Sequence, residues 1–224
     1  VSAGLHLAYY LLLQRGYAVG DLSVVYPTAR AAGPTLSVLA AVLIFGERPS
    51  PGVLLGGVLI VAGVVALVWE RGSPSRDRAR VSVAFGLLVG AIIGCYTLWD
   101  AYAVSALLIP PLLLDYVATL GRLAMLSPSV ARRRGRPAGA VSIANVWRDH
   151  RRAVLGVAIL SPLSYILVLM ALVSTPVSYV APAREVSVLF AVLIGGQLLG
   201  EGSTGRRLLA AVVMFAGIVV LATG

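Results

Sequence analysis

The sequence contains no lysine and a single cysteine, and charged residues make up only 12% of its 224 positions. A soluble domain carries about 25% charged residues, so this composition argues against a soluble domain. Cys95 has no partner for an internal disulfide and is predicted to be a packing residue. The net charge of +9 rests on arginine alone. Because the arginines lie between apolar segments, a bias toward the cytoplasmic side explains them, and we expect no nucleic-acid partner.

The chain also lacks the usual motifs of catalysis and of nucleotide or metal binding. It has no Gly-rich nucleotide loop with a lysine, no metal-like spacing of His or Cys, and no Ser/His/Asp arrangement. We therefore expect no enzymatic activity, no catalytic residues, no metal and no cofactor. If the protein transports a solute, it is a secondary carrier or a facilitator, because no ATPase machinery is evident.

Long apolar segments dominate the chain, which is 59% hydrophobic with a mean hydropathy of +0.94. A helix needs about 20 apolar residues to cross a bilayer. The sequence predicts an all-α, polytopic transmembrane bundle of about eight helices in the plasma or inner membrane. The predicted spans are Val1–Leu13 (too short to cross), Leu22–Phe45, Val53–Trp69, Val81–Trp99, Ala106–Leu126, Ala153–Val173 (interrupted by Pro162), Val177–Leu199 and Leu208–Ala222.

The span Leu22–Phe45 carries one charge, Arg30, in a segment with no polar face. A charge at this depth costs at least about 2.5 kcal/mol, so Arg30 is expected to have a role. The span ends in Gly46-Glu47, where Glu47 is predicted to be a structural turn residue. Ser50 is predicted to cap the next helix, with Pro51 in its first turn.

The same stretch recurs 154 positions later without gaps. Arg30 then falls on Arg184, and Gly46-Glu47 falls on Gly200-Glu201. Residues 26–67 and 180–221 share 13 identities in 42 positions. We interpret this as a duplicated unit, as in carriers built from two related halves. The predicted halves are 1–69 and 81–224, joined by a linker at 70–80.

Alternating spans place fifteen of the 18 arginines on one side, including those of the linker and of the loop Ser127–Arg152. This bias predicts that the basic side is cytoplasmic. The two Gly-Glu loops fall on opposite sides, so the two repeats are predicted to be inverted.

The run GDLSVVYP…GP…FGE followed by LLGGVLIVAGVV, the second copy AAVVMFAGIVVL, and YTLWDAYAV at Tyr96–Val104 resemble EamA-type members of the drug/metabolite transporter superfamily. The resemblance implies ten helices in two inverted five-helix repeats, so the first two helices would be missing here. It also implies amino acids or related metabolites as substrates. A ten-helix member with both termini inside would place the basic side outside, whereas the arginine bias places it in the cytoplasm.

Five residues are candidates for substrate binding: Arg30, Arg184, Glu185, Tyr26 and Tyr96. The arginines could face a carboxylate or phosphate, or could hold helices together by pairing with Glu185. Glu185 could couple transport to protons, or could be a counter-ion to Arg30. The tyrosines could line a cavity or anchor the helices at the membrane interface.

The remaining charged residues are predicted to have structural roles. Asp100 and Asp115 are expected to be solvated near span ends, and Arg122 to lie too far from Asp115 for a direct pair. His6 is expected to be a satisfied packing residue.

Gly86, Gly90 and Gly94 lie on one stripe of the fourth span, a spacing that lets a neighbouring helix approach closely.

These observations favour secondary transport, in the direction of efflux, of a small organic metabolite such as an amino acid. The expected partners are the lipid bilayer and a small-molecule substrate. A multidrug efflux carrier and a non-transporting or truncated membrane protein stay open as alternatives.

Overall fold

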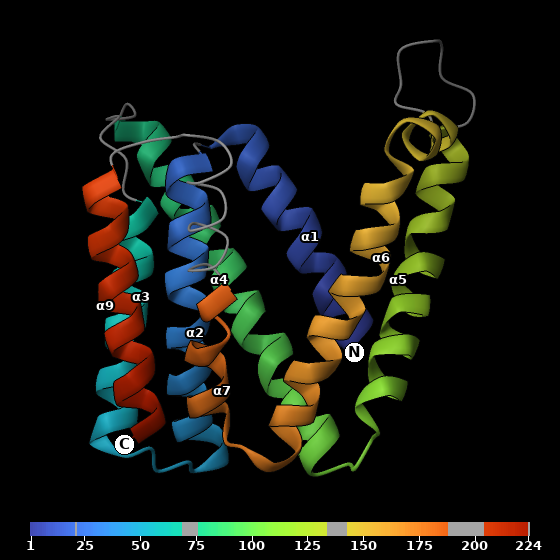
Figure 1. Cartoon of the computed structure of the whole chain (residues 1–224). Coiled ribbons are helices and arrows are strands. Elements are labelled where there is room, and N and C mark those ends of the chain that lie inside the picture. Colours follow the sequence, from blue (N-terminus) through green and yellow to red (C-terminus); the bar gives the residue numbers. More distant parts are fainter. Residues whose placement is uncertain (21, 69–75, 134–142, 188–203, 224) are drawn as a thin grey trace.

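The structure is a computed structural model that describes residues 1–20, 22–68, 76–133, 143–187 and 204–223, and these residues contain helices but no strands. The helices are α1 (Ser2–Val19), α2 (Leu22–Phe45), α3 (Pro51–Val68), α4 (Arg76–Ser105), α5 (Pro111–Arg133), α6 (Ile143–Ser174), α7 (Val177–Ala183) and α9 (Thr204–Thr223). Consecutive helices run in opposite directions along the bundle (Figure 1). The predicted pair Gly200-Glu201 lies outside the described residues, as do the end of the seventh span and residues 70–75 of the linker.

The bundle has the surface of a membrane protein. Three helical segments of the described chain are long and apolar enough to cross a membrane: Val24–Phe45, Arg80–Ser105 and Asn145–Ser174. Two shorter helical segments are also apolar, Pro51–Gly63 and Val212–Leu221. Large apolar side chains cover the outside, among them Leu43 at 82% exposure and Ile44 at 69%. Contact with water would cost roughly 25 cal/mol per Å² of such surface. Lipid is therefore the medium that this surface fits, and the predicted all-α membrane bundle is confirmed.

Several helices extend beyond their predicted apolar spans into polar sequence. The predicted span Val1–Leu13 was too short, since α1 continues to Val19. The predicted loop Ser127–Arg152 was too long, since α5 continues to Arg133 and α6 begins at Ile143. Likewise α4 begins at Arg76, inside the predicted linker. Helix satisfies the backbone hydrogen bonds near the membrane edge, and long arginine side chains can keep their charged ends in water.

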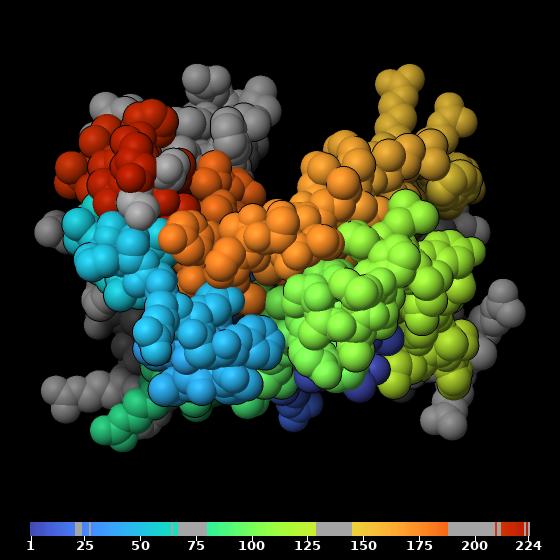
Figure 2. Space-filling model, turned by 90° about the horizontal axis from the view of Figure 1, so that it is seen from below, coloured from blue at the N-terminus to red at the C-terminus, as the bar shows by residue number. Residues whose placement is uncertain are grey.

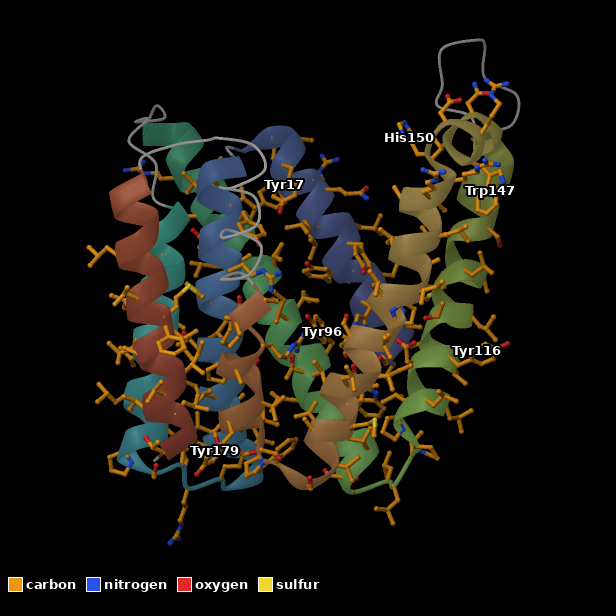
Figure 3. The ribbon with its side chains drawn as sticks, viewed as in Figure 1. Tyr17, Tyr96, Tyr116, Trp147, His150 and Tyr179 are labelled. Atoms are coloured by element: carbon orange, nitrogen blue, oxygen red, sulfur yellow. The ribbon has the colours of Figure 1, made fainter. Side chains whose placement is uncertain are left out.

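The predicted interruption of the sixth span at Pro162 was wrong. Helix α6 runs through Pro162 without a break, and its non-helical residue is His150, with φ −128° and ψ 25°. Proline is tolerated inside transmembrane helices because neighbouring groups and small local adjustments satisfy the freed backbone. The non-helical residue therefore lies near the N-terminal end of α6, where Figure 3 labels the His150 and Trp147 side chains.

Helices α2 and α4 pack closely along the predicted glycine stripe. A Cβ added at Gly86 would lie 2.5 Å from Thr28 Cβ, and one added at Gly90 would lie 2.5 Å from Ala32 Cβ. At Gly94 the same atom would be 3.6 Å from Leu36 Cβ, an ordinary contact. The prediction that this stripe faces a neighbouring helix is confirmed.

A second close approach joins α3 to α9. A Cβ on Gly56 would lie 2.7 Å from the carbonyl oxygen of Gly217, and a Cβ on Gly217 would lie 2.8 Å from that of Gly56. The two helices run in opposite directions side by side (Figure 1). The third span and the last helix thus meet through backbone rather than side chains, as small residues allow in membranes.

The Gly-Glu turn after α2 binds the start of α7. Gly46 has φ of 67°, a left-handed conformation that glycine adopts without strain. The Glu47 carboxylate then accepts hydrogen bonds from the backbone N–H groups of Val177 (2.8 Å) and Ser178 (2.9 Å). The neighbouring cap is as predicted, since Ser50 Oγ accepts from the N–H of Val53 at 3.1 Å.

An apolar cluster fills this end of the bundle, next to the Glu47 turn. Its buried members come from α2, α4, α5, α6 and α7, and they are Ala41, Ala101, Ala103, Val104, Leu114, Leu169, Leu172, Val177, Val180 and Ala181. From below, the atoms of these helix ends and of their connections form a continuous surface (Figure 2). The cluster therefore joins segments far apart in the sequence at one end of the molecule.

We expect Gly90→Leu to lower the melting temperature in detergent. Leucine would collide with Ala32 of α2, and overpacking typically costs about 1–3 kcal/mol or more. The control is Gly156→Leu, because a Cβ at Gly156 meets nothing within 4 Å. Equal melting temperatures for the two variants would show that the α2–α4 contact does not stabilise the fold.

We also expect Glu47→Ala to destabilise the protein by about 1–2 kcal/mol, the usual cost of losing a side-chain helix cap. Glu47→Gln keeps one acceptor oxygen and should cost less. Thermal unfolding in detergent measures both variants. A Glu47→Ala protein as stable as the parent would contradict the capping role.

Candidate functional site

The candidate site begins where α7 ends. The buried residue Pro182 lies in the last turn of α7, and Arg184 and Glu185 follow in a turn in which the Glu185 N–H donates to the Pro182 carbonyl at 3.0 Å. Proline removes a backbone donor and disfavours a continuous helix. Interrupted helices often form the binding sites of secondary carriers. The break places two charged residues inside the bundle.

Arg30 of α2 pairs with Glu185. Its Nη1 lies 3.3 Å from Oε1 and 3.5 Å from Oε2 of the carboxylate. Glu185 is 4% exposed, whereas the Arg30 side chain is 33% exposed. Removing one partner of a buried pair typically costs about 3–5 kcal/mol, so this contact holds α2 against the segment after α7.

Arg184 has a different set of neighbours, all of them neutral. Its guanidinium donates to Thr97 Oγ1 at 3.2 Å and to the Tyr96 hydroxyl at 3.4 Å. Its Cζ also lies 5.8 Å from the ring centre of Tyr96 and 5.9 Å from that of Tyr165. In the described part of the chain, no carboxylate lies within ion-pair distance of Arg184. Among the described residues, its direct contacts are therefore hydroxyls and aromatic faces, and the Glu185 carboxylate acts on it from a greater distance.

Both candidate tyrosines lie beside an arginine. The Tyr26 ring centre is 5.5 Å from Arg30 Cζ. Tyr96 lies near the middle of the bundle (Figure 3), stacked on His6 with ring centres 4.3 Å apart and 6.0 Å from the ring of Tyr9. The structure thus brings all five predicted site residues into two adjoining groups linked by the sequence neighbours Arg184 and Glu185.

Other tyrosines lie outside this region. Tyr10, Tyr102 and Tyr116 are 45%, 43% and 61% exposed. Tyr116 points away from the bundle on α5 (Figure 3). These exposed side chains are therefore not part of the group around Arg30 and Arg184.

The prediction that Asp100 and Asp115 are solvated was wrong, since both are buried. Helix α4 continues to Ser105, which places Asp100 more than one turn inside the bundle. There its Oδ2 accepts a hydrogen bond from the Tyr165 hydroxyl. The apolar sequence after Asp100 was the signal that could have revealed this burial. Nothing in the sequence marked Tyr165 or Thr97 as partners of the charged residues.

The prediction that Arg122 cannot reach Asp115 was also wrong, since Arg122 Nη2 lies 3.9 Å from Asp115 Oδ1. Long side chains on a helix point back toward its N-terminus, which lets this arginine span the two turns. Cys95 is exposed rather than packed inside, because it falls on the outer face of α4. His6 is buried, and its Nδ1–H donates to the Ser2 carbonyl at 3.0 Å.

The site therefore contains two guanidinium groups and one carboxylate in a largely apolar bundle. A guanidinium presents several donors in a fixed fork that suits a carboxylate or phosphate. Since Glu185 neutralises only one arginine, the group carries an excess positive charge. Its chemistry suits binding an anionic group.

Comparison with known proteins agrees with this architecture. The model of the EamA-like transporter family matches residues 80–223. A solved structure titled only as the crystal structure of a protein superposes with a TM-score of 0.78 at 15% identity, over 99% of this chain and 75% of that chain. This likeness supports the fold alone. No curated protein matches the sequence. The family match covers more than half of the sequence and agrees with the apolar helices, so this chain belongs to the EamA-like transporter family, a family of multi-pass membrane transporters.

Proposed function

We propose that this protein is a secondary carrier that exports small metabolites bearing a carboxylate, such as amino acids, across the cell membrane. The observation that carries the proposal is the convergence of Arg30, Glu185 and Arg184 from two distant parts of the sequence. Intramembrane ionisable residues are costly and usually functional. No enzymatic step is part of the proposal.

Arg184 is the proposed ligand of the substrate carboxylate. Its present partners, Thr97 and Tyr96, are neutral and bond at 3.2 and 3.4 Å, so an incoming carboxylate would offer a stronger, charge-assisted partner. The Glu185 carboxylate lies next in the chain and can attract the ammonium group of an amino acid. Because Glu185 pairs with Arg30, it does not form an ion pair with Arg184 that would compete with the substrate carboxylate.

Transport by this site requires the apolar end of the bundle to open and close. The cluster around Leu169 and Val177 and the Glu47 bonds to α7 join both parts of the chain at that end. We propose that these contacts separate when the carrier faces that side, as in alternating access between two inverted halves.

Efflux of lipophilic cations is the competing function. Two arginines against one glutamate make it unfavourable, because a cation would meet an excess positive charge. A screen of purified protein in proteoliposomes compares amino acids, other carboxylates and tetraphenylphosphonium. Transport of tetraphenylphosphonium without any carboxylate would overturn the proposal.

We expect Arg30→Lys to weaken transport less than Arg30→Ala, and Arg184→Ala to raise the half-saturation concentration. A hydrogen bond to a charged group contributes about 1.5–3 kcal/mol, so losing it corresponds to roughly 10-fold to 100-fold. Lysine keeps the charge but loses the guanidinium fork. The measurement is efflux per mole of monodisperse protein.

Arg148→Ala is the matched control, because Arg148 is exposed and, among the described residues, pairs only with its neighbour Asp149. If the arginines only hold helices together, replacing them should lower the yield of folded protein and leave transport per folded molecule unchanged. Normal specific transport in both Arg30→Ala and Arg184→Ala would therefore refute the site.

The end of the bundle that contains the α5–α6 connection is proposed to be cytoplasmic. The arginine bias motivates this orientation. In a Cys95→Ser background, Asn145→Cys should resist an impermeant thiol reagent in intact cells and react after permeabilisation. Ser174→Cys, exposed at the opposite end of α6, should react in intact cells. The reverse pattern would show that the orientation is inverted.

A further inference from the structure

A second polar cluster lies next to the arginine site, and the proposed binding chemistry does not use it. Its centre is Asp100 of α4, which is completely buried. The Tyr165 hydroxyl of α6 donates to its Oδ2. The rings of Tyr165 and His6 of α1 lie nearly perpendicular to each other, with ring centres 5.2 Å apart. Asp115 of α5 is buried nearby and interacts electrostatically with Asp100.

The Asp100 carboxylate has less compensation than any other carboxylate buried in the described helices. Its Oδ1 is buried and has no hydrogen-bond partner among the described residues. No cation of the described chain lies within 4 Å of it, whereas Glu185 has Arg30 and Asp115 has Arg122. An uncompensated charge inside an apolar bundle is costly, and a bound proton removes it.

We propose that Asp100 is the proton-binding site that couples this carrier to the proton gradient. A proton from water binds Oδ1 when the carrier faces one side, giving a neutral carboxylic acid. The same proton returns to water when the carrier faces the other side. This assignment differs from Glu185, the residue that the sequence offered for proton coupling, because Glu185 already has a cationic partner.

Charged and titratable groups lie around Asp100 on the neighbouring helices. Tyr165 of α6 bonds to it, and His6 of α1 and Asp115 of α5 interact with it electrostatically. Among the other charged groups, Arg122 of α5 pairs with Asp115, Arg184 after α7 lies over the Tyr165 ring, and Arg30 of α2 pairs with Glu185. None of them forms an ion pair with Asp100 within the described part of the chain.

Tyr165 provides the link between the two sites. Its hydroxyl bonds to Asp100, and the face of its ring lies 5.9 Å from the Arg184 guanidinium. A substrate that moves Arg184 would shift this ring and change the hydrogen bond to Asp100. Proton occupancy and substrate occupancy can therefore influence each other without direct contact. The coupling rests on the proposed function, whereas proton binding by Asp100 does not.

Infrared spectroscopy of the purified protein during a pH titration tests the site directly, with the proton as the only ligand. We expect the carbonyl band of a buried protonated carboxylic acid to appear and disappear with pH. Asp100→Asn should remove this band. Asp115→Asn should keep it, and so should the exposed control Asp149→Asn. A band that survives in Asp100→Asn, or a parent protein without any such band, overturns the proposal.

Tyr165→Phe is a second variant in case Asp100→Asn does not fold. It removes the hydrogen bond to Oδ2 and leaves the carboxylate in place. The carbonyl stretching frequency of a protonated carboxylic acid depends on its hydrogen bonds, so the band should move to a different wavenumber. A band at an unchanged wavenumber would show that the protonated group is not the one bonded to Tyr165.

Proteoliposomes loaded with the pH dye pyranine test the coupling. Addition of a mixture of the proteinogenic amino acids should move protons in the parent protein, and Asp100→Asn should lower proton flux relative to exchange of labelled amino acids. An equal ratio of proton flux to amino-acid exchange in the parent and in Asp100→Asn would overturn the coupling role. A requirement for Na⁺ in place of the pH gradient would overturn it as well. If the parent exchanges no amino acid, the proposed function has failed, and the infrared titration still decides whether Asp100 binds the proton.

Discussion

The cost of placing charge in an apolar medium governs the interior of this protein. The buried and half-buried charged groups are compensated in different ways. Arg30 and Glu185 neutralise each other at 3.3 Å, Arg184 rests on hydroxyls and aromatic faces, and Glu47 accepts two backbone N–H groups. Among the described residues, Asp100 has one donor, the Tyr165 hydroxyl. Under the proposed function, this ranking from full to partial compensation would separate structural charges from those that bind a substrate or a proton.

Close helix packing makes these contacts possible. Because lipid provides little hydrophobic drive between helices, their association depends on van der Waals contact and interhelical hydrogen bonds. Glycines let α4 approach α2 at Gly86 and Gly90, and let α3 approach α9 at Gly56. The first contact places Tyr96 and Thr97, further along α4, within reach of Arg184. Backbone proximity in one part of the bundle therefore sets the side-chain geometry of the site.

The site also illustrates why a broken helix is useful in a membrane carrier. A continuous helix through Pro182 would carry Arg184 and Glu185 on adjoining faces about 100° apart. In the turn after Ala183, the Glu185 side chain meets Arg30 of α2, and the Arg184 side chain meets Thr97 and Tyr96 of α4. Two charges that are neighbours in the sequence therefore have separate partners, and under the proposed function they would bind the two charged groups of one substrate.

The sequence by itself determined the fold class, most helix positions, the glycine contact and the candidate charges. These features follow from hydropathy, spacing and the rarity of charge, all of which are local. The sequence could not determine where Asp100 and Asp115 lie, because burial depends on where a helix ends and on which helices surround it. It left open whether Glu185 pairs with Arg30, and gave no sign of Tyr165, since partners 65 to 155 residues apart meet only when the bundle packs. Only the tertiary structure decided which charges are compensated.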